Sequence, residues 1–256
     1  MIHPTALIDS SAEIGANVSI GPYSIVGKNV TIEENCKIGP HVVIEGPTQI
    51  GKETQIFQFA SIGEAPQDKK YAGEDTRLEI GARNVIREGC TLNRGTIQDR
   101  NVTTIGDDNW IMAYVHIAHD CIVGNNTILA NNVALAGHVT VDDFAILGGF
   151  TLVHQFCHIG AHSFTAMGSA ISKDLPPFIM ASGNLAKPHG LNTEGLKRRG
   201  LSGEQIKAIK QAYKIIYRSG NTLDEAKAEL SELSQNSSHV SLMLQFLDNV
   251  TRGIVR

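Results

Sequence analysis

Aliphatic side chains recur at every sixth position along most of the chain. The repeat has three stretches: Ile2 to Ile62, Ile80 to Leu92 and, shifted by one position, Ile105 to Ile159. The position two residues before each aliphatic residue is small or β-branched. A period of six matches neither a helical turn nor the two-residue alternation of a strand. The pattern predicts short strands separated by turns and stacked into an all-β solenoid with one continuous aliphatic core.

Two polar stretches interrupt the repeat. The first spans residues 64–77 and reads EAPQDKKYAGEDTR, and the second runs from about residue 94 to residue 103. Because neither keeps the inward aliphatic residue, both are expected to project from the solenoid as loops. Long excursions from a regular scaffold often carry function.

After Pro176 and Pro177 the pattern becomes helical. Ser202 with Gln205, and Thr222 with Glu225, have the spacing of capping boxes that open helices. Three apolar stripes at helical spacing follow, and their members are Ile206, Ile209, Tyr213 and Ile216; Leu223, Ala226, Leu230 and Leu233; and Val240, Met243, Leu244, Leu247 and Val250. We predict a solenoid domain over residues 1–185 and an α-helical domain over residues 186–256 that caps one end.

Charge and composition narrow the class of protein. The net charge of −4 argues against non-specific nucleic-acid binding, which needs a basic surface. The chain has no apolar run of the length that a membrane span needs, and its first residues lack the basic start and apolar stretch of a signal peptide. We therefore expect a cytoplasmic protein.

The four cysteines all occupy the small inward position of a hexad: Cys36, Cys90, Cys121 and Cys157. A cysteine at such a position packs like a small hydrophobic residue. The chain contains no CxxC motif, so neither zinc binding nor a disulfide is favoured. None of the four is expected to act as a nucleophile.

The hexad repeat resembles that of the left-handed parallel β-helix family, in which three hexads form one triangular coil of about 18 residues. Residues 18 apart should then stack on neighbouring coils, about 4.8 Å from one another. With this spacing, several histidines and their neighbours are predicted to lie next to one another on three adjacent coils and to form one patch. The members of the patch are His116, His119, Asp120, Gly137, His138, His154 and Gln155.

A histidine patch on a β-helix has two chemical uses, and the residues alone leave both open. One is metal binding, as in the γ-class carbonic anhydrases, which have this fold. The other is general-base acyl transfer, because imidazole accepts a proton near neutral pH. Asp120 can hold the tautomer of His119 only if the pair lies at a corner, since neighbours on a strand face opposite ways. The Gly137 N–H is then available to stabilise an oxyanion.

Longer motifs resemble one family. The segments HIAHDCIVGN (residues 116–125), LAGHVTVDDFAILGG, VHQFCHIGAH and GLNTEGLKRRG are similar to the UDP-N-acetylglucosamine acyltransferases of lipid A biosynthesis, and the similarity covers the whole chain. The resemblance implies a homotrimer that transfers an (R)-3-hydroxyacyl chain from acyl carrier protein to the 3-hydroxyl of UDP-N-acetylglucosamine. The donor is carried on the phosphopantetheine of acyl carrier protein, and neither another cofactor nor a metal is implied.

The resemblance also implies roles for individual residues. It makes His119 the general base, Asp120 its orienting carboxylate and Gly137 the donor to the oxyanion. The implied substrate-binding residues are His116, His138, His154 and Gln155 on the coils; Gln67, Asp68 and Lys70 in the first loop; and Asn192, Glu194 and Arg198 from an adjacent chain. Met167 and Leu185 stand where long-chain enzymes carry Gly and His, so they are expected to set acyl length. Asn93 replaces a histidine of many relatives, and its role stays open.

Seven basic residues between Lys197 and Arg218 face a single acidic residue, Glu204. In a chain of negative net charge, this local excess favours an acidic partner such as acyl carrier protein over an ordinary solvated helix face. Other readings are a hexapeptide acyltransferase that uses acyl-CoA, an enzyme that acylates a 3-amino UDP-sugar, and a metal-dependent hydratase. An ice-binding β-helix would need a regular outward threonine ladder, which is absent.

Overall fold

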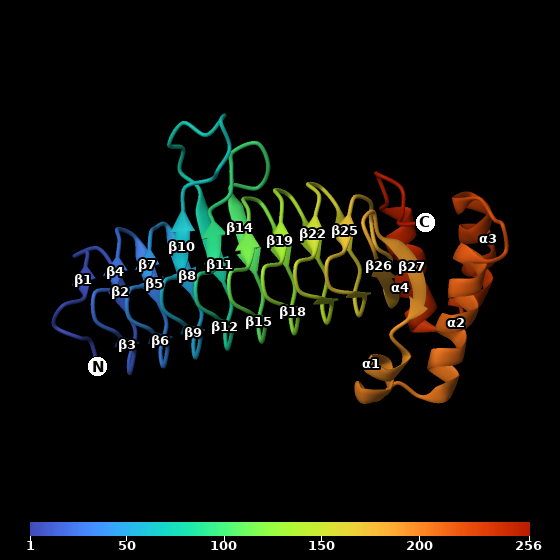
Figure 1. The fold of residues 1–256 in the computed structure, drawn as a ribbon, viewed down its shortest axis with the longest axis horizontal. Helices are drawn as coiled ribbons and strands as arrows, with labels where there is room; N and C mark the ends of the chain where they lie inside the picture. The colour runs from blue at the N-terminus through green and yellow to red at the C-terminus, as the bar shows by residue number, and fades with distance from the viewer.

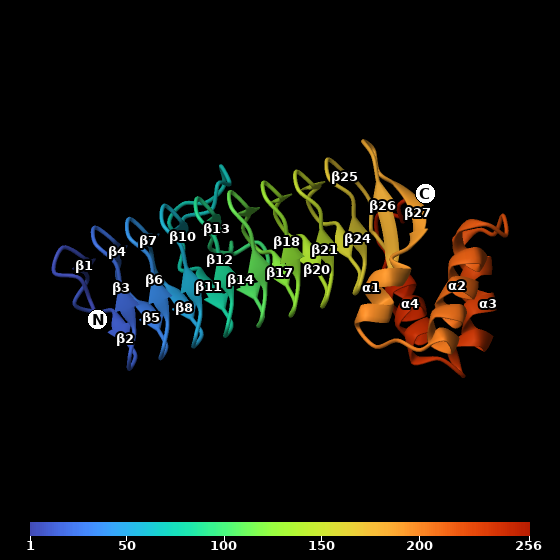
Figure 2. The same cartoon turned by 60° about the horizontal axis from the view of Figure 1, so that its bottom comes forward.

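The computed structural model describes residues 1–256 and confirms the predicted fold class. A left-handed parallel β-helix is followed by a small α-helical domain at its C-terminal end (Figure 1). The coils stack along one axis from the N-terminus toward the helices, and the same arrangement is visible after the molecule is turned (Figure 2).

The coils contribute their strands to three sheets. The first sheet contains β1 (Leu7–Ile8), β4 (Ile25–Val26), β7 (Val43–Ile44), β10 (Ser61–Glu64), β13 (Thr91–Asn93), β16 (His116–Ile117), β19 (Ala134–Leu135), β22 (Leu152–Val153) and β25 (Ala170–Ile171). The second contains β2 (Glu13–Ile14), β5 (Val30–Ile32), β8 (Thr48–Ile50), β11 (Arg77–Ile80), β14 (Val102–Ile105), β17 (Ile122–Val123), β20 (Thr140–Val141) and β23 (His158–Ile159). The third contains β3 (Ser19–Ile20), β6 (Lys37–Ile38), β9 (Gln55–Ile56), β12 (Val85–Ile86), β15 (Trp110–Ile111), β18 (Ile128–Leu129), β21 (Ile146–Leu147), β24 (Phe164–Thr165), β26 (Ile179–Ser182) and β27 (Lys187–Leu191).

The predicted 18-residue stacking is confirmed by the strand register. His116 pairs with Ala134, Ala134 with Leu152, and Leu152 with Ala170, all in parallel. The hexad aliphatic residues point inward and are buried from Ile20 onward, where they form one core that continues into the helical domain. Coil corners adopt positive φ at many positions, which lets the chain turn from one sheet to the next.

Both predicted loops project from the same side of the solenoid, near β10 and β14 (Figure 1). Their ends differ slightly from the prediction. Glu64 pairs with Asn93, and Arg77 pairs with Val102, so the strands extend into both interruptions and leave loops over residues 65–76 and 94–101. The hexad pattern did not predict these strand ends, because their backbone pairing does not depend on an aliphatic side chain.

The helical domain contains α1 (Thr193–Arg198), α2 (Gly203–Tyr217), α3 (Leu223–Ser234) and α4 (Ser238–Asp248). Ser202 and Thr222 form the predicted capping boxes at the starts of α2 and α3. The segment predicted to be helical from residue 186 begins with β27, which pairs antiparallel with β26, and its first helix starts at Thr193. None of the helices combines the length and the apolar composition that a membrane-spanning helix requires.

The four cysteines are free and buried inside the coils, as predicted. Burial raises the pKa of the Cys90 and Cys157 thiols to about 11 and that of the Cys121 thiol to about 12. A thiol in this state is rarely ionised at neutral pH, and the thiolate is the nucleophilic form. The cysteines therefore serve as core side chains.

Candidate active site

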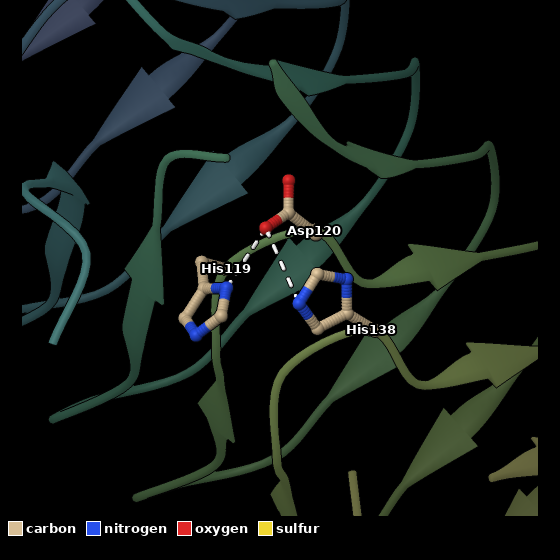
Figure 3. Close-up of side chains that lie close together, drawn as sticks. All are labelled: His119, Asp120 and His138. Carbon is tan, nitrogen blue, oxygen red and sulfur yellow. Dashed lines mark hydrogen bonds and ion pairs between the residues drawn. The ribbon is translucent and has the colours of Figure 1, made fainter. Parts of the chain in front are cut away.

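His119 and Asp120 meet at a corner of the coil that begins with β16. Asp120 has a φ of 61°, which turns the chain so that the two neighbouring side chains approach each other. His119 Nδ1 lies 2.8 Å from Asp120 Oδ2 (Figure 3). The corner placement that the sequence required for a histidine–carboxylate pair is present.

The Asp120 carboxylate is fully buried and heavily hydrogen-bonded. Thr96 donates its N–H to Oδ1 at 2.8 Å and its hydroxyl to Oδ2 at 2.6 Å. The Asp120 N–H donates to the hydroxyl oxygen of Thr103. Burial alone would raise the pKa of Asp120, but the hydrogen bonds from His119 and Thr96 outweigh it and hold the pKa below its ordinary value.

An ionised Asp120 decides the tautomer of His119. A carboxylate can only accept hydrogen bonds, so the short contact requires a proton on His119 Nδ1. The other ring nitrogen, Nε2, then carries a free lone pair in the neutral imidazole. A histidine in this arrangement can act as a general base, with Nε2 as the accepting atom.

Gly137 lies directly against the His119 ring, one coil further along. A Cβ atom at this position would lie 2.6 Å from His119 Cε1 and 2.8 Å from Nε2, so any side chain would displace the base. The Gly137 N–H donates no hydrogen bond within the chain, although the neighbouring Ala136 and His138 N–H groups do. A free amide beside the base is suited to binding an oxyanion that develops there.

His138 completes the cluster that Figure 3 shows. Its Nε2 is 3.8 Å from Asp120 Oδ2, and its Nδ1 is 2.9 Å from Asp99 Oδ2. His119, Asp120 and His138 offer nitrogen and oxygen atoms within 4.8 Å of one another, the composition of a metal site. Both oxygens of Asp120, however, already accept hydrogen bonds from Thr96, and Oδ2 also accepts the one from His119.

An apolar groove begins beside this cluster and runs along the outer face of the first sheet. Its volume is about 460 Å³, and its walls come from four consecutive coils. The residues that line it are His116, Ala134, Leu135, Ala136, Leu152, Val153, His154, Ala170, Ile171, Ser172 and Leu185. Three of these residues are alanines, whose small side chains leave room for a hydrocarbon chain to lie along the groove.

Two of the other predicted coil residues belong to the wall of the groove. His116 and His154 line it directly, and the Thr91 hydroxyl and His116 Nδ1 share a hydrogen bond of 2.7 Å. Burial lowers the pKa of His116, which favours its neutral form. The carbonyl oxygen of Gln155 accepts a hydrogen bond from Arg252 in the C-terminal tail, a contact that sequence spacing did not indicate.

The predicted residues of the first loop are at least partly exposed on its surface. Asp68 Oδ1 accepts the N–H of Lys70, and Gln67 and Lys70 are exposed. Asn93, whose role the sequence left open, is buried at the base of this loop. Its side-chain amide donates to the carbonyl oxygens of Ala65 and Glu64, so Asn93 anchors the start of the loop.

Asn192, Glu194 and Arg198 are not brought to His119 within one chain. They belong to α1 and its N-terminal cap, which lie past the last coils and on the side opposite to the two loops (Figure 1). Asn192 caps α1 by accepting the N–H of Gly195, and Glu194 pairs with Lys197 at 2.9 Å.

The two predicted acyl-length residues have different environments. Leu185 lines the far end of the groove, where the segment around it is hydrogen-bonded to both backbone groups of Ala170. Met167 is outside the groove of its own chain, and 81% of its surface is exposed.

Two residues of the second loop that sequence spacing did not single out are part of the site, Thr96 and Asp99. Phe156 follows His138 by 18 residues, the spacing of stacked coils, and its ring stacks on that histidine with a centroid distance of 4.4 Å. Thr96 follows Asn93 by three positions, and the replacement of a histidine by Asn93 was the only sequence signal near it.

A parallel β-helix of hexads that carries a histidine–carboxylate pair beside an apolar groove is the architecture of a hexapeptide-repeat acyltransferase. Residues 11–46 and 103–137 match the family described as bacterial transferase hexapeptide (six repeats). Residues 174–255 match the family described as UDP N-acetylglucosamine O-acyltransferase, domain 2.

Full-length relatives narrow the class further. The chain is 64% identical over 255 residues to an acyl-[acyl-carrier-protein]–UDP-N-acetylglucosamine O-acyltransferase of Thiobacillus denitrificans, covering 100% of this chain and 99% of the relative. The solved structure of the UDP-N-acetylglucosamine O-acyltransferase of Moraxella catarrhalis is 51% identical, with a TM-score of 0.98 over 100% of this chain and 99% of that one. That of the Francisella novicida UDP-N-acetylglucosamine acyltransferase is 43% identical, with a TM-score of 0.98 over 100% and 94%. The chain belongs to the acyl-[acyl-carrier-protein]–UDP-N-acetylglucosamine O-acyltransferase family.

Proposed function

We propose that this protein transfers an (R)-3-hydroxyacyl chain from acyl carrier protein to the 3-hydroxyl of UDP-N-acetylglucosamine, the first step of lipid A biosynthesis, in the cytoplasm. The observation that carries the proposal is the His119–Asp120 pair at the mouth of an apolar groove. The names of the full-length relatives state an acyl-[acyl-carrier-protein] donor, UDP-N-acetylglucosamine as the acceptor and O-acyl transfer.

In the proposed reaction the sugar hydroxyl attacks the thioester carbonyl directly. His119 Nε2 accepts the hydroxyl proton, and the Gly137 N–H stabilises the negative charge that develops on the carbonyl oxygen. The new C–O bond forms as the C–S bond breaks, and the thiol of the carrier leaves with a proton. No covalent enzyme intermediate is needed, which agrees with the burial of all four cysteines.

The proposed reaction needs no cofactor beyond the phosphopantetheine of the donor and no metal. The support is the engagement of the Asp120 oxygens by Thr96 and His119, which makes that group a hydrogen-bonding partner rather than a free ligand.

The proposed docking surface for acyl carrier protein is the basic face of α1 and α2. All seven basic side chains of this face are exposed: Lys197, Arg198, Arg199, Lys207, Lys210, Lys214 and Arg218. Only Lys197 among them has an acidic partner, Glu194. An acidic protein is steered toward such a surface by its charge.

A comparison of donors and acceptors tests the function. Purified protein should consume 3-hydroxyacyl carrier-protein thioesters with UDP-N-acetylglucosamine much faster than the matching CoA thioesters. Equal or faster use of CoA thioesters would overturn the carrier-protein assignment. A strong preference for a 3-amino UDP-sugar would replace the ester product by an amide and would correct the acceptor.

The active sites of the proposed homotrimer are shared between chains. Large apolar side chains stay exposed along one edge of the solenoid, and a monomer rarely leaves such a stripe uncovered. They are Leu7, Tyr23, Phe59, Tyr114, Phe150 and Leu152. Arg198 belongs to α1, which lies past the last coils, whereas His119 follows β16 in the middle of the solenoid, and this separation supports a site completed by a neighbour.

Mixed trimers test this arrangement. His119→Ala and Arg198→Ala chains should each be inactive alone, and co-expressed chains with different tags can be purified through both tags. About one site in three of every mixed trimer then combines an intact His119 with an intact Arg198 from its neighbour. We expect about a third of wild-type activity. If verified mixed trimers are as inactive as their parents, each site lies within one chain.

Acyl length should be set at the end of the groove. We expect a preferred 3-hydroxyacyl donor of roughly ten to twelve carbons, because a longer chain is pushed against the side chains at the groove end. Leu185→Gly should lengthen the preferred chain, and Met167→Gly should do so through the groove of a neighbouring subunit. Product masses from a ladder of donors measure the profile, and the KM for the sugar nucleotide serves as the control. A wild-type preference for fourteen carbons, or two flat variants, would contradict this account.

A further inference from the structure

His138 has a carboxylate partner of its own, in addition to its neighbour Asp120. Its Nδ1 lies 2.9 Å from Oδ2 of Asp99, which belongs to the second loop and precedes His138 by 39 residues. We propose that Asp99 is a positioning residue that fixes the tautomer and the ring orientation of His138 in the acyl-transfer site. The proposal rests on the proposed function and adds a residue that none of the sequence motifs indicated.

The His138 ring is held on several sides. Phe156 stacks on one face with a centroid distance of 4.4 Å and an interplanar angle of 13°. The His119 ring meets it edge-on at 5.1 Å, and only 16% of the His138 side chain is exposed. Stacking fixes the plane of the ring, but a stacked ring can still flip by a half turn about the Cβ–Cγ bond and return to the same plane with Nδ1 and Cδ2 exchanged. A hydrogen bond to one specific nitrogen removes this freedom.

Asp99 supplies that hydrogen bond, with the carboxylate as the acceptor and the ring N–H as the donor. A carboxylate only accepts, so the contact keeps a proton on His138 Nδ1 and directs Nε2 toward the site. Nε2 then lies 3.8 Å from Asp120 Oδ2. The charged and titratable groups facing the ring are thus Asp99, Asp120 and His119. The site therefore contains two carboxylate–histidine pairs: Asp99 with His138, and Asp120 with His119.

A single turn positions both pairs. The Thr96 carbonyl oxygen accepts the N–H groups of Asp99 and Asn101, which closes the turn. The same Thr96 donates two hydrogen bonds to Asp120, while Asp99 accepts from His138. A loop 94–101 placed in this way holds the orientation of both histidines, although it supplies neither of them.

The decisive variant is Asp99→Asn, because it keeps the shape of the side chain and changes its polarity. An asparagine amide can donate to Nδ1, which stabilises the opposite tautomer with the proton on Nε2. Asp99→Ala removes the partner and leaves a mixture. The matched control is Asp142→Asn, since Asp142 accepts from His158 Nε2 at 2.8 Å in a similarly exposed pair on the second sheet.

Two measurements are made on the full-length protein: kcat/KM for acyl transfer, and ¹⁵N NMR of histidine-labelled protein, with the His138 signal identified by its loss in His138→Gln. Wild type should show a proton on His138 Nδ1. Asp99→Asn should remove that proton and lower kcat/KM by about 10- to 100-fold, the range for a lost hydrogen bond to a charged group. Asp142→Asn should change neither.

Three results would overturn the proposal. Asp99→Asn could keep the Nδ1 proton and lie within about twofold of wild-type activity, as a purely spatial role of the side chain requires. It could lose activity with the Nδ1 signal unchanged, or lose the Nδ1 proton without losing activity. If wild type performs no acyl transfer, the proposed function fails, whereas the Nδ1 signal still decides whether Asp99 sets the tautomer.

Discussion

His119→Ala is expected to lower kcat by about 10²- to 10⁴-fold while the protein stays folded. The variant removes the imidazole that lies against Gly137, whose N–H is free, and that is placed to accept the hydroxyl proton. His119 is not part of the solenoid core, so the melting temperature should change little. Steady-state kinetics with saturating donor and acceptor give kcat.

The matched control for this variant is His3→Ala, which removes an exposed histidine far from the site and should leave kcat unchanged. If His119→Ala keeps more than about a tenth of wild-type kcat, another group is the base.

Asp120→Asn is expected to cost about as much, on the order of 10²- to 10⁴-fold in kcat. Asparagine can donate its amide hydrogen to His119 Nδ1, which moves the ring proton to Nε2 and removes the lone pair that accepts the substrate proton. Because the two residues act as one unit, the double variant should be little worse than His119→Ala alone.

The Asp120 variant needs a check on stability, because its side chain is buried and accepts hydrogen bonds from Thr96. Circular dichroism and the melting temperature supply that check, and Asp142→Asn again serves as the control. A folded Asp120→Asn protein with kcat near that of wild type would show that the carboxylate does not set the tautomer of His119.

The coils were predictable from sequence because their spacing repeats. A period of 18 placed Gly137 next to His119 and His138 next to Asp120, and the strand register confirms this stacking. The capping boxes of α2 and α3 were predictable for a different reason, since they depend only on residues three positions apart.

The 18-residue spacing predicts neighbours only within the regular coils and not in the loops. Thr96 and Asp99 lie in a loop of irregular length, so no fixed offset relates them to Asp120 and His138. The loop insertions also change the spacing of stacked residues, which is 30 from Ile62 to Leu92 and 25 from Leu92 to Ile117. The contact of Arg252 with Gln155 joins residues 97 positions apart and depends on how the helical domain folds back.

The function of the site as a whole is tested most directly by identifying the product. Wild-type protein is incubated with UDP-N-acetylglucosamine and a 3-hydroxyacyl carrier-protein thioester, and the products are analysed by mass spectrometry with fragmentation. The account predicts a sugar nucleotide heavier by one 3-hydroxyacyl group, esterified at the 3-hydroxyl, together with one free carrier thiol for each ester. Unmodified sugar nucleotide with free 3-hydroxy acid, or acylation at another position, would contradict it.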